Sequence, residues 1–131
     1  MNGSRVVVRR ATAQDMADCY AVRRKVFTEG MGVPASVDVD GRDEHCDHVI
    51  ARVGVSPAGT ARMRDHCGHA KIERVAVLDT YRGTGIGALI MRELQELAMA
   101  GGYKVLELHA QVQVVGFYEK LGYISVGERF Q

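Results

Sequence analysis

The residues best suited to bind a ligand form a glycine-rich turn in the second half of the chain. Gly83, Gly85 and Gly87 follow directly after Arg82. Because glycine has no Cβ, such a turn lets backbone N–H groups come close to a ligand. A helix that begins there adds free N–H groups and the positive end of its dipole, and the Arg82 guanidinium adds a full positive charge. The turn therefore predicts a binding site for a phosphate group.

Three classes of phosphate ligand fit such a turn, and the neighbouring residues weigh against two of them. No Gly-Lys-Ser/Thr ends the turn, which excludes a Walker nucleotide site. The pattern Gly83-x-Gly85-x-x-Ala88 fits a nicotinamide dinucleotide site, with Glu107 where the ribose-binding acid would stand. However, residues 79–82 separate the preceding strand from the turn, and only 24 residues follow Glu107, too few for the remaining parallel strands. The dinucleotide is therefore a remote alternative, and coenzyme A is the third candidate.

A second group of residues has the chemistry of metal ligands. His45-Cys46-Asp47-His48 and His66-Cys67-Gly68-His69 repeat the pattern His-Cys-x-His. A hairpin between them would bring the two tetrads together, and imidazole and thiolate are good zinc ligands. The spacing matches no common zinc module, and histidines in surface turns are the simpler explanation. We therefore predict no metal and keep a structural zinc as an alternative.

Composition limits what the whole chain can do. With 131 residues, 47% of them hydrophobic and 25% charged, we expect a single globular domain, residues 1–131. The formal net charge of +1 predicts no bulk attraction to nucleic acid or to a membrane. Three cysteines are too few for a disulfide framework, which predicts a cytoplasmic protein. No apolar run approaches the roughly 20 residues of a membrane span.

The elements that must position these residues follow from hydrophobic periodicity and turn residues. In chain order we expect a strand (6–8), a helix capped by Thr12 (12–28), a loop (29–47) and a hairpin (48–64) around a turn at 56–59. A further strand (71–78), the glycine turn with its helix (83–100), a strand (103–110), a short helix (113–121) and a last strand (123–128) follow. Arg23, Arg24 and Lys25 are expected on a solvated edge of the first helix.

The loop over residues 29–47 is the most acidic stretch of the chain. Its acids stand at positions 38, 40, 43, 44 and 47. Two interpretations remain equally open: a solvated loop, or a lip that attracts a cationic substrate.

The residues around the glycine turn resemble those of the GNAT superfamily of acetyl-CoA-dependent N-acetyltransferases. Arg82-x-x-Gly85-x-Gly87 resembles the pyrophosphate loop of that family, and Val75-Ala76-Val77 precedes it as the family's fourth strand does. The heptapeptide 117–123, Phe-Tyr-Glu-Lys-Leu-Gly-Tyr, resembles the signature of its fourth helix. Arg24-x-Val26-Phe27 and Gly32-Val33-Pro34 are similar to the small bacterial ElaA/YjcF-like branch.

The resemblance implies an α+β fold. The GNAT fold is a mixed, mostly antiparallel sheet that splays between its fourth and fifth strands and carries helices on both faces. The chain ends after the sixth expected strand, so the family's seventh strand is expected to be missing. A homodimer is one way to cover the edge that this would expose.

The resemblance also assigns roles to single residues. Tyr118 matches the general acid that protonates the leaving thiolate, and Glu73 stands where many members keep a carboxylate base, although an ion pair with Arg74 is an equal alternative. Gln111 replaces the family's usual Asn seven residues before the tyrosine, as it does in the ElaA/YjcF-like branch. The expected contacts of acetyl-CoA are Val75, Ala76, Val77, Arg82, Gly83, Thr84, Gly85, Ile86, Gly87, Gln111, Phe117 and Tyr118.

The function implied is acetyl transfer from acetyl-CoA to a primary amine by direct attack through a tetrahedral intermediate. The acceptor is expected to be a small, cationic molecule, because the loop at 29–47 is acidic. A domain that binds acyl-CoA without turnover is the alternative from another class.

Overall fold

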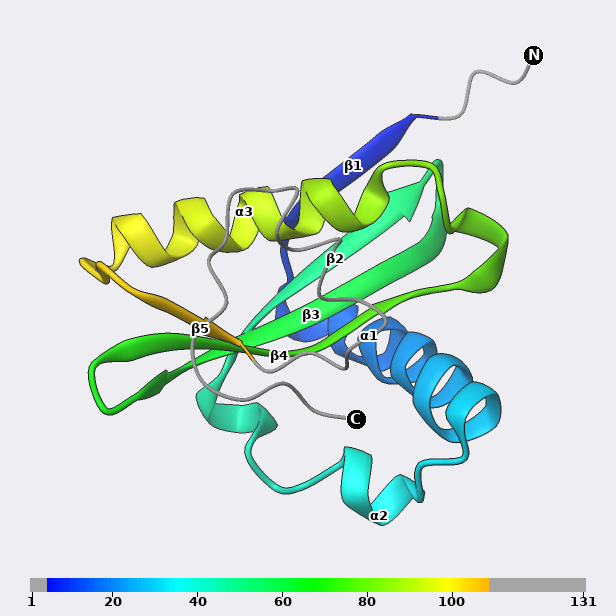
Figure 1. Cartoon of the computed structure of the whole chain (residues 1–131). Coiled ribbons are helices and arrows are strands. Elements are labelled where there is room, and N and C mark those ends of the chain that lie inside the picture. Colours follow the sequence, from blue (N-terminus) through cyan, green and yellow to red (C-terminus); the bar gives the residue numbers. More distant parts are fainter. Residues whose placement is uncertain (1–4, 109–131) are drawn as a thin grey trace.

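The strands of the protein form one mixed sheet in the order β1-β2-β3-β4-β5. The computed structural model describes residues 5–108, and Figure 1 shows these strands with the helices around them. The strands are β1 (Val6–Arg10), β2 (Asp47–Val53), β3 (Ser56–His66), β4 (His69–Val77) and β5 (Leu106–Leu108). Strands β1 to β4 pair antiparallel, whereas β4 and β5 pair in parallel. The mixed, mostly antiparallel sheet expected from the sequence is thereby confirmed.

Two longer helical segments lie on opposite faces of this sheet (Figure 1). The first begins with a 3₁₀ turn, Ala13–Asp15, continues as α1 (Met16–Arg23) and ends in a π-helical stretch, Arg24–Glu29. Its start is stabilised by the Asp15 carboxylate, which accepts hydrogen bonds from the Thr12 N–H at 2.8 Å and the Thr12 hydroxyl at 3.0 Å. The second, α3 (Ile86–Ala100), ends at the expected glycines.

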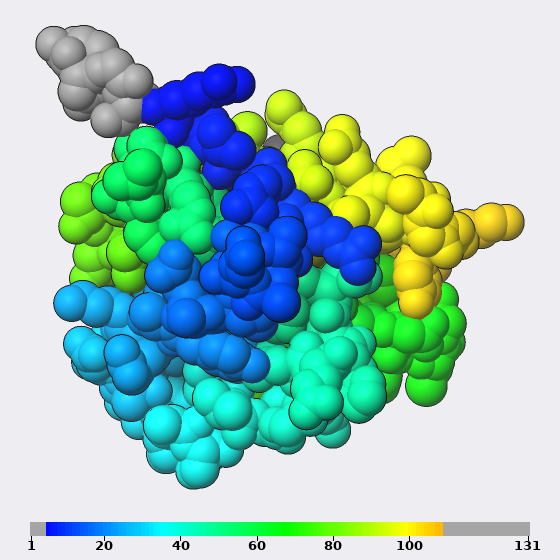
Figure 2. Space-filling model, turned by 180° about the vertical axis from the view of Figure 1, so that it is seen from behind, coloured from blue at the N-terminus to red at the C-terminus, as the bar shows by residue number. Residues whose placement is uncertain are grey.

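Three short helical turns complete the described part of the chain. They are α2 (Ala35–Asp38) and the 3₁₀ turns Asp43–His45 and Asp79–Tyr81. Within residues 5–108, no helix combines the length and the apolar character that crossing a membrane requires. In the space-filling view from behind, the blue and cyan first half of the chain forms one continuous surface, next to α3 in yellow (Figure 2).

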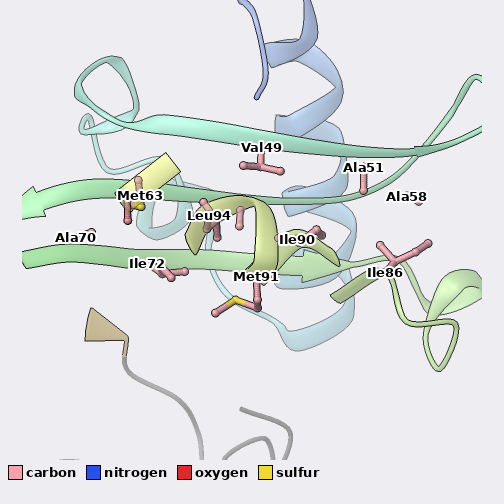
Figure 3. Close-up of a cluster of buried hydrophobic side chains, with 12 residues drawn as sticks. Val49, Ala51, Ala58, Met63, Ala70, Ile72, Ile86, Ile90, Met91 and Leu94 are labelled. Carbon is pink, nitrogen blue, oxygen red and sulfur yellow. The ribbon is translucent and has the colours of Figure 1, made fainter. Parts of the chain in front are cut away.

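The main core lies between α3 and the sheet (Figure 3). Helix α3 contributes side chains spaced three and four residues apart, as a one-sided apolar helix must. Its buried residues are Ile86, Ile90, Met91, Leu94 and Ala98, and they meet Val49, Ala51, Ala58, Met63, Ala70 and Ile72 of the strands. Leu89 of the same helix is 37% exposed, whereas Met91 is buried. A smaller core of Val22, Val26 and Ala76 holds the first helical segment on the other face.

The hairpin between β2 and β3 turns earlier than the sequence suggests. Its two-residue turn is Gly54-Val55, and Gly54 has a φ of 61°, whereas residues 56–59 belong to β3. The expectation of a turn at 56–59 is therefore wrong. Gly59 is needed for close packing instead: a Cβ there would lie 2.9 Å from Ile90 Cδ1 and 3.0 Å from the Ala76 carbonyl oxygen.

Candidate active site

The glycine turn follows the 3₁₀ turn Asp79–Tyr81 after the end of β4 and leads directly into α3. Gly83 and Gly85 have φ values of 80° and 87°, in the left-handed region that glycine adopts without strain. The first helical hydrogen bond runs from the Leu89 N–H to the Gly85 carbonyl oxygen at 3.2 Å, so the N–H groups of residues 86–88 precede the helical pattern. Residues 82–85 are exposed. This geometry is suited to an anion at the start of α3.

Arg82 connects the glycine turn to the end of β4. Its Nε donates to the Val77 carbonyl oxygen at 3.2 Å, and its guanidinium lies 2.7 Å from the Asp79 carboxylate. The side chain is 57% exposed, so a phosphate can still approach it. A hollow of about 220 Å³ borders Arg82, and Lys25 and Leu78 are among its lining residues.

Beyond Ile72, strand β4 has no partner on its β5 side within residues 5–108. The parallel pairing joins residues 70–72 to residues 106–108 and then stops. The side chains of Val75 and Val77 pack against the core under α3, and Ala76 belongs to the core on the other face. Backbone N–H and C=O groups along such an edge can bind an extended ligand. We call residues 75–77, which have no partner on this side within residues 5–108, the free edge of β4; residues 78–81 connect it to the glycine turn.

Strand β4 also contains a β-bulge, just before this edge. On β3, Arg62 pairs with Glu73 and Thr60 pairs with Ala76, so Arg74 and Val75 together face Ala61. Arg74 has a φ of 57°. The extra residue puts the side chains of Glu73 and Arg74 on the same face. The apolar residues around Glu73 therefore alternate irregularly: Ile72 and Val75 both pack in the core under α3 but are three positions apart.

Glu73 is surrounded by cations from β3 and β4. Its carboxylate lies 3.0 Å from both Arg62 and Arg64, and 3.7 Å from Lys71 Nζ, with 13% of the side chain exposed. Burial favours a raised pKa for Glu73, but the hydrogen bond from Arg64 and the charges of Arg62 and Arg64 outweigh it, so the pKa lies below its ordinary value. Glu73 is therefore ionised at neutral pH but weakly basic. Its ion-pair partners are these residues rather than Arg74.

Arg23 is buried, contrary to the expectation of a solvated edge. Its side chain is 1% exposed and lies 3.2 Å from Asp38 and 2.6 Å from Asp43. Arg24 and Lys25 are exposed, as expected. The periodicity of the helix does not reveal that the following loop returns to cover Arg23 with two carboxylates.

The acidic loop provides internal ion pairs. Asp38 and Asp43 are 4% and 7% exposed, so the interpretation as a solvated loop is wrong for both. Arg62 contacts Asp40 at 2.7 Å and Asp43 at 3.0 Å. The hydrogen bond from Arg62 keeps the pKa of Asp40 well below its usual range. Since arginines neutralise these three acids, the attraction that they can exert on a cationic substrate is small.

The histidines of the two His-Cys-x-His tetrads contact different residues. His48 is buried, with Nε2 3.0 Å from the Asp43 carbonyl oxygen. His66 and His69 each place Nδ1 3.2 Å from the Glu107 carboxylate. Within residues 5–108, no group of three or more His, Cys, Asp or Glu residues is arranged to hold a metal ion. The side chain proposed for a dinucleotide ribose, Glu107, contacts these histidines.

Several expected site residues lie outside the described part of the chain. These are Gln111, Phe117 and Tyr118, together with the helix expected at 113–121 and the strand at 123–128. Their roles stay predictions. The remaining expected site residues follow one another along β4 and the start of α3: Glu73 comes first, then residues 75–77, then residues 82–87.

Comparison with known proteins decides the family. Residues 12–131 match the family described as Acetyltransferase (GNAT) domain. The chain belongs to the GNAT acetyltransferase family. Its relatives include the uncharacterised N-acetyltransferase YjcF of Bacillus subtilis (strain 168), which is 35% identical over 116 residues, covering 88% of this chain and 83% of YjcF.

Solved structures share the GNAT fold with this chain. An acyl-CoA N-acyltransferase from Pseudomonas aeruginosa has a TM-score of 0.80 at 22% identity, over 96% of this chain and 90% of that one. The aminoglycoside N-acetyltransferase AAC(6')-Iy in complex with CoA has a TM-score of 0.77 at 15% identity, over 99% and 95% of the two chains. The resemblance inferred from the glycine turn is thus confirmed: the protein is a GNAT acyltransferase. Enzymes of this family use acyl-CoA as cosubstrate, and a solved structure with the same fold contains CoA.

Proposed function

We propose that this GNAT enzyme transfers the acetyl group of acetyl-CoA to a primary amine of a small molecule. The observation that carries the proposal is that the edge of β4 left unpaired within residues 5–108 leads, through residues 78–81, to the exposed glycine turn. An extended pantetheine arm fits along residues 75–77, and its pyrophosphate fits on the N–H groups of residues 82–87. In this proposal the thioester lies near the bulge and Glu73.

Acetyl transfer then needs a group that protonates the departing thiolate. The neutral amine attacks the thioester carbonyl, a C–N bond forms, and the C–S bond breaks as the tetrahedral intermediate collapses. We assign the proton to Tyr118, because a phenol ordinarily has a pKa near 10 and is therefore protonated at neutral pH. The motif at 117–123 supports this assignment.

A base must also take the proton that the amine loses. Glu73 is the candidate, acting through water, because its carboxylate is ionised and partly exposed beside the free edge of β4. Its lowered pKa makes direct abstraction less favourable, which supports the water-mediated route.

The acceptor is proposed as a small primary amine without a requirement for high positive charge. The acids at 38, 40 and 43 are paired with arginines. They therefore give no preference for binding a polycation over an amine whose remaining groups are uncharged. A homodimer and the single-domain arrangement of residues 1–131 stay predictions.

A thiol-release assay with acetyl-CoA and a panel of amines tests the proposal. The panel contains amino acids, amino sugars, polyamines and short peptides, each compared with a reaction that lacks acceptor. Amine-dependent release of CoA, with mass spectrometry showing an acetylated product, supports the transfer. Acetyl-CoA binding in calorimetry without release for any amine favours the non-catalytic acyl-CoA module instead.

A further inference from the structure

Arg74 has a backbone conformation that its position in a strand does not account for. Within residues 5–108, two non-glycine residues have a positive φ: Cys67 at 54° and Arg74 at 57°. Cys67 forms the two-residue turn between β3 and β4 with Gly68, whose φ is 86°, and such a turn requires positive φ at both positions. Arg74 lies inside β4 instead. The left-handed conformation is unfavourable for an L residue with a side chain, so other contacts must hold Arg74 there.

The bulge at Arg74 sets the orientation of the strand that follows it. Because Arg74 and Val75 oppose the single residue Ala61, Val75 turns toward the α3 face, while Arg74 turns toward the acidic loop. Bulges of this kind re-aim side chains and backbone groups, and they are frequent next to active sites. The residues that are re-aimed here are those of the free edge, 75–77.

The Arg74 side chain makes the contacts that can hold this conformation. Its Nη2 donates to the Val37 carbonyl oxygen at 3.1 Å, and its Nε donates to the Asp38 carbonyl oxygen at 3.3 Å. The guanidinium also lies 3.2 Å from the Asp38 carboxylate and 3.3 Å from that of Asp40. One side chain thus contacts both backbone and carboxylates of residues 37–40.

Residues 37–40 are themselves anchored to other elements. The Asp38 carboxylate also pairs with Arg23 of α1, and the Asp40 carboxylate also pairs with Arg62 of β3. Segment 37–40 is therefore anchored by its own ion pairs, and the contacts of Arg74 with this segment can keep the bulge in place. Loss of the Arg74 contacts would release the bulge and the segment together.

The geometry points to Arg74 as a positioning residue of the acyltransfer site, an inference that rests on the proposed function. Through its guanidinium it fixes the left-handed bulge, so that the N–H and C=O groups of residues 75–77 stay aligned for the thioester arm. Through the same contacts it couples segment 37–40 to the strand that binds the cosubstrate. Arg74 itself needs no contact with substrate.

The test uses Arg74→Gly, with Arg74→Lys as a milder variant and Cys67→Gly as the control. Glycine accepts the backbone conformation without strain but removes every side-chain contact. An effect of Arg74→Gly therefore reports the loss of the side-chain contacts and not backbone strain. Cys67→Gly relieves the other positive φ in an exposed turn. We expect Arg74→Gly to lower kcat on the order of 10- to 100-fold, because small misplacements in an active site have effects of this size. Arg74→Lys should recover part of that loss, and Cys67→Gly should keep the wild-type kcat.

Amide hydrogen exchange provides a readout that does not depend on turnover. In Arg74→Gly, the amides of residues 37–40 and those of residues 75–77 should exchange faster together, while Cys67→Gly leaves both unchanged. A wild-type kcat in a folded Arg74→Gly variant, or faster exchange in only one of the two segments, would overturn the inference. If Arg74→Gly does not fold, Arg74→Lys carries the same two readouts. Absence of transfer by the wild-type enzyme would contradict the proposed function instead, and the exchange comparison would still test the coupling.

Discussion

At the scale of single residues, Gly85 and Gly68 have the same backbone conformation in different surroundings. Their φ values are 87° and 86°, and a Cβ on either would meet no atom within 4 Å. Gly85 begins α3 in the glycine turn, whereas Gly68 lies in the β3–β4 turn. The two residues therefore separate the effect of backbone strain from the effect of ligand binding.

We predict that Gly85→Ala and Gly68→Ala lower the free energy of unfolding by similar amounts, about 1–2 kcal/mol, because alanine is strained at positive φ. Only Gly85→Ala should weaken acetyl-CoA binding, since it distorts the N–H groups that we propose bind the pyrophosphate. Urea unfolding and isothermal titration calorimetry measure the two quantities. Equal acetyl-CoA affinity in both variants would place the pyrophosphate elsewhere.

Tyr118→Phe tests the proposed general acid. Removal of the hydroxyl leaves the thiolate without a proton donor, so kcat should fall on the order of 100-fold, while the KM for acetyl-CoA changes little. Steady-state kinetics over several amine concentrations provide both values. The mutant Phe117→Leu is a control for packing in the same motif, and its kcat should fall less. Unchanged turnover in Tyr118→Phe would rule out the assignment.

At the scale of elements, periodicity and turn residues predict much of the described fold, but not where charged side chains are buried. The apolar spacing of residues 86–98 correctly predicts α3, and the glycines at its ends correctly predict its bounds. The burial of Arg23 could not be predicted, because it depends on Asp38 and Asp43 returning from a loop without periodicity. The bulge at Arg74 left a sequence signal, an irregular alternation, but no residue type such as glycine that would have identified it.

Close packing between β3 and α3 makes Gly59 sensitive to substitution. In Gly59→Ala the new Cβ would clash with the Ala76 carbonyl oxygen and with Ile90, so the free energy of unfolding should fall by about 1–3 kcal/mol. Gly101→Ala is the matched control, because its Cβ would lie no closer than 3.4 Å to other atoms and its φ of −83° suits alanine. Thermal unfolding should therefore separate the two variants, and equal melting temperatures would contradict the packing at Gly59.

At the scale of the whole molecule, buried ion pairs link α1, the acidic loop and the sheet. The side chains of Arg23 and Arg62 are each 1% exposed, and both contact the buried carboxylate of Asp43. Burial of Asp43 favours a raised pKa, but hydrogen bonds from Arg23 and Arg62 outweigh it, so its pKa lies below the ordinary value, as it does for Glu73. Such charges cost free energy to bury, and removal of one partner leaves the others uncompensated.

This network predicts the pH dependence of stability. A carboxyl group whose pKa is lower in the folded than in the unfolded state stabilises the fold above its unfolded pKa, which is about 4 for Asp and Glu. That contribution is lost as the pH falls through the folded pKa. The free energy of unfolding should therefore be level above about pH 5 and decrease below about pH 4.

Asp43→Asn should remove part of this dependence. At pH 7 we expect a loss of about 3 kcal/mol or more, because two buried guanidinium groups lose a charged partner. The difference from wild type should become smaller as the pH falls toward 3, since protonation then removes the same charge from the wild-type protein. Urea unfolding at several pH values measures it, with the exposed neighbour Glu44→Gln as the control. A difference that stays constant from pH 7 to pH 3 would mean that Asp43 stabilises the fold by its shape rather than by its charge.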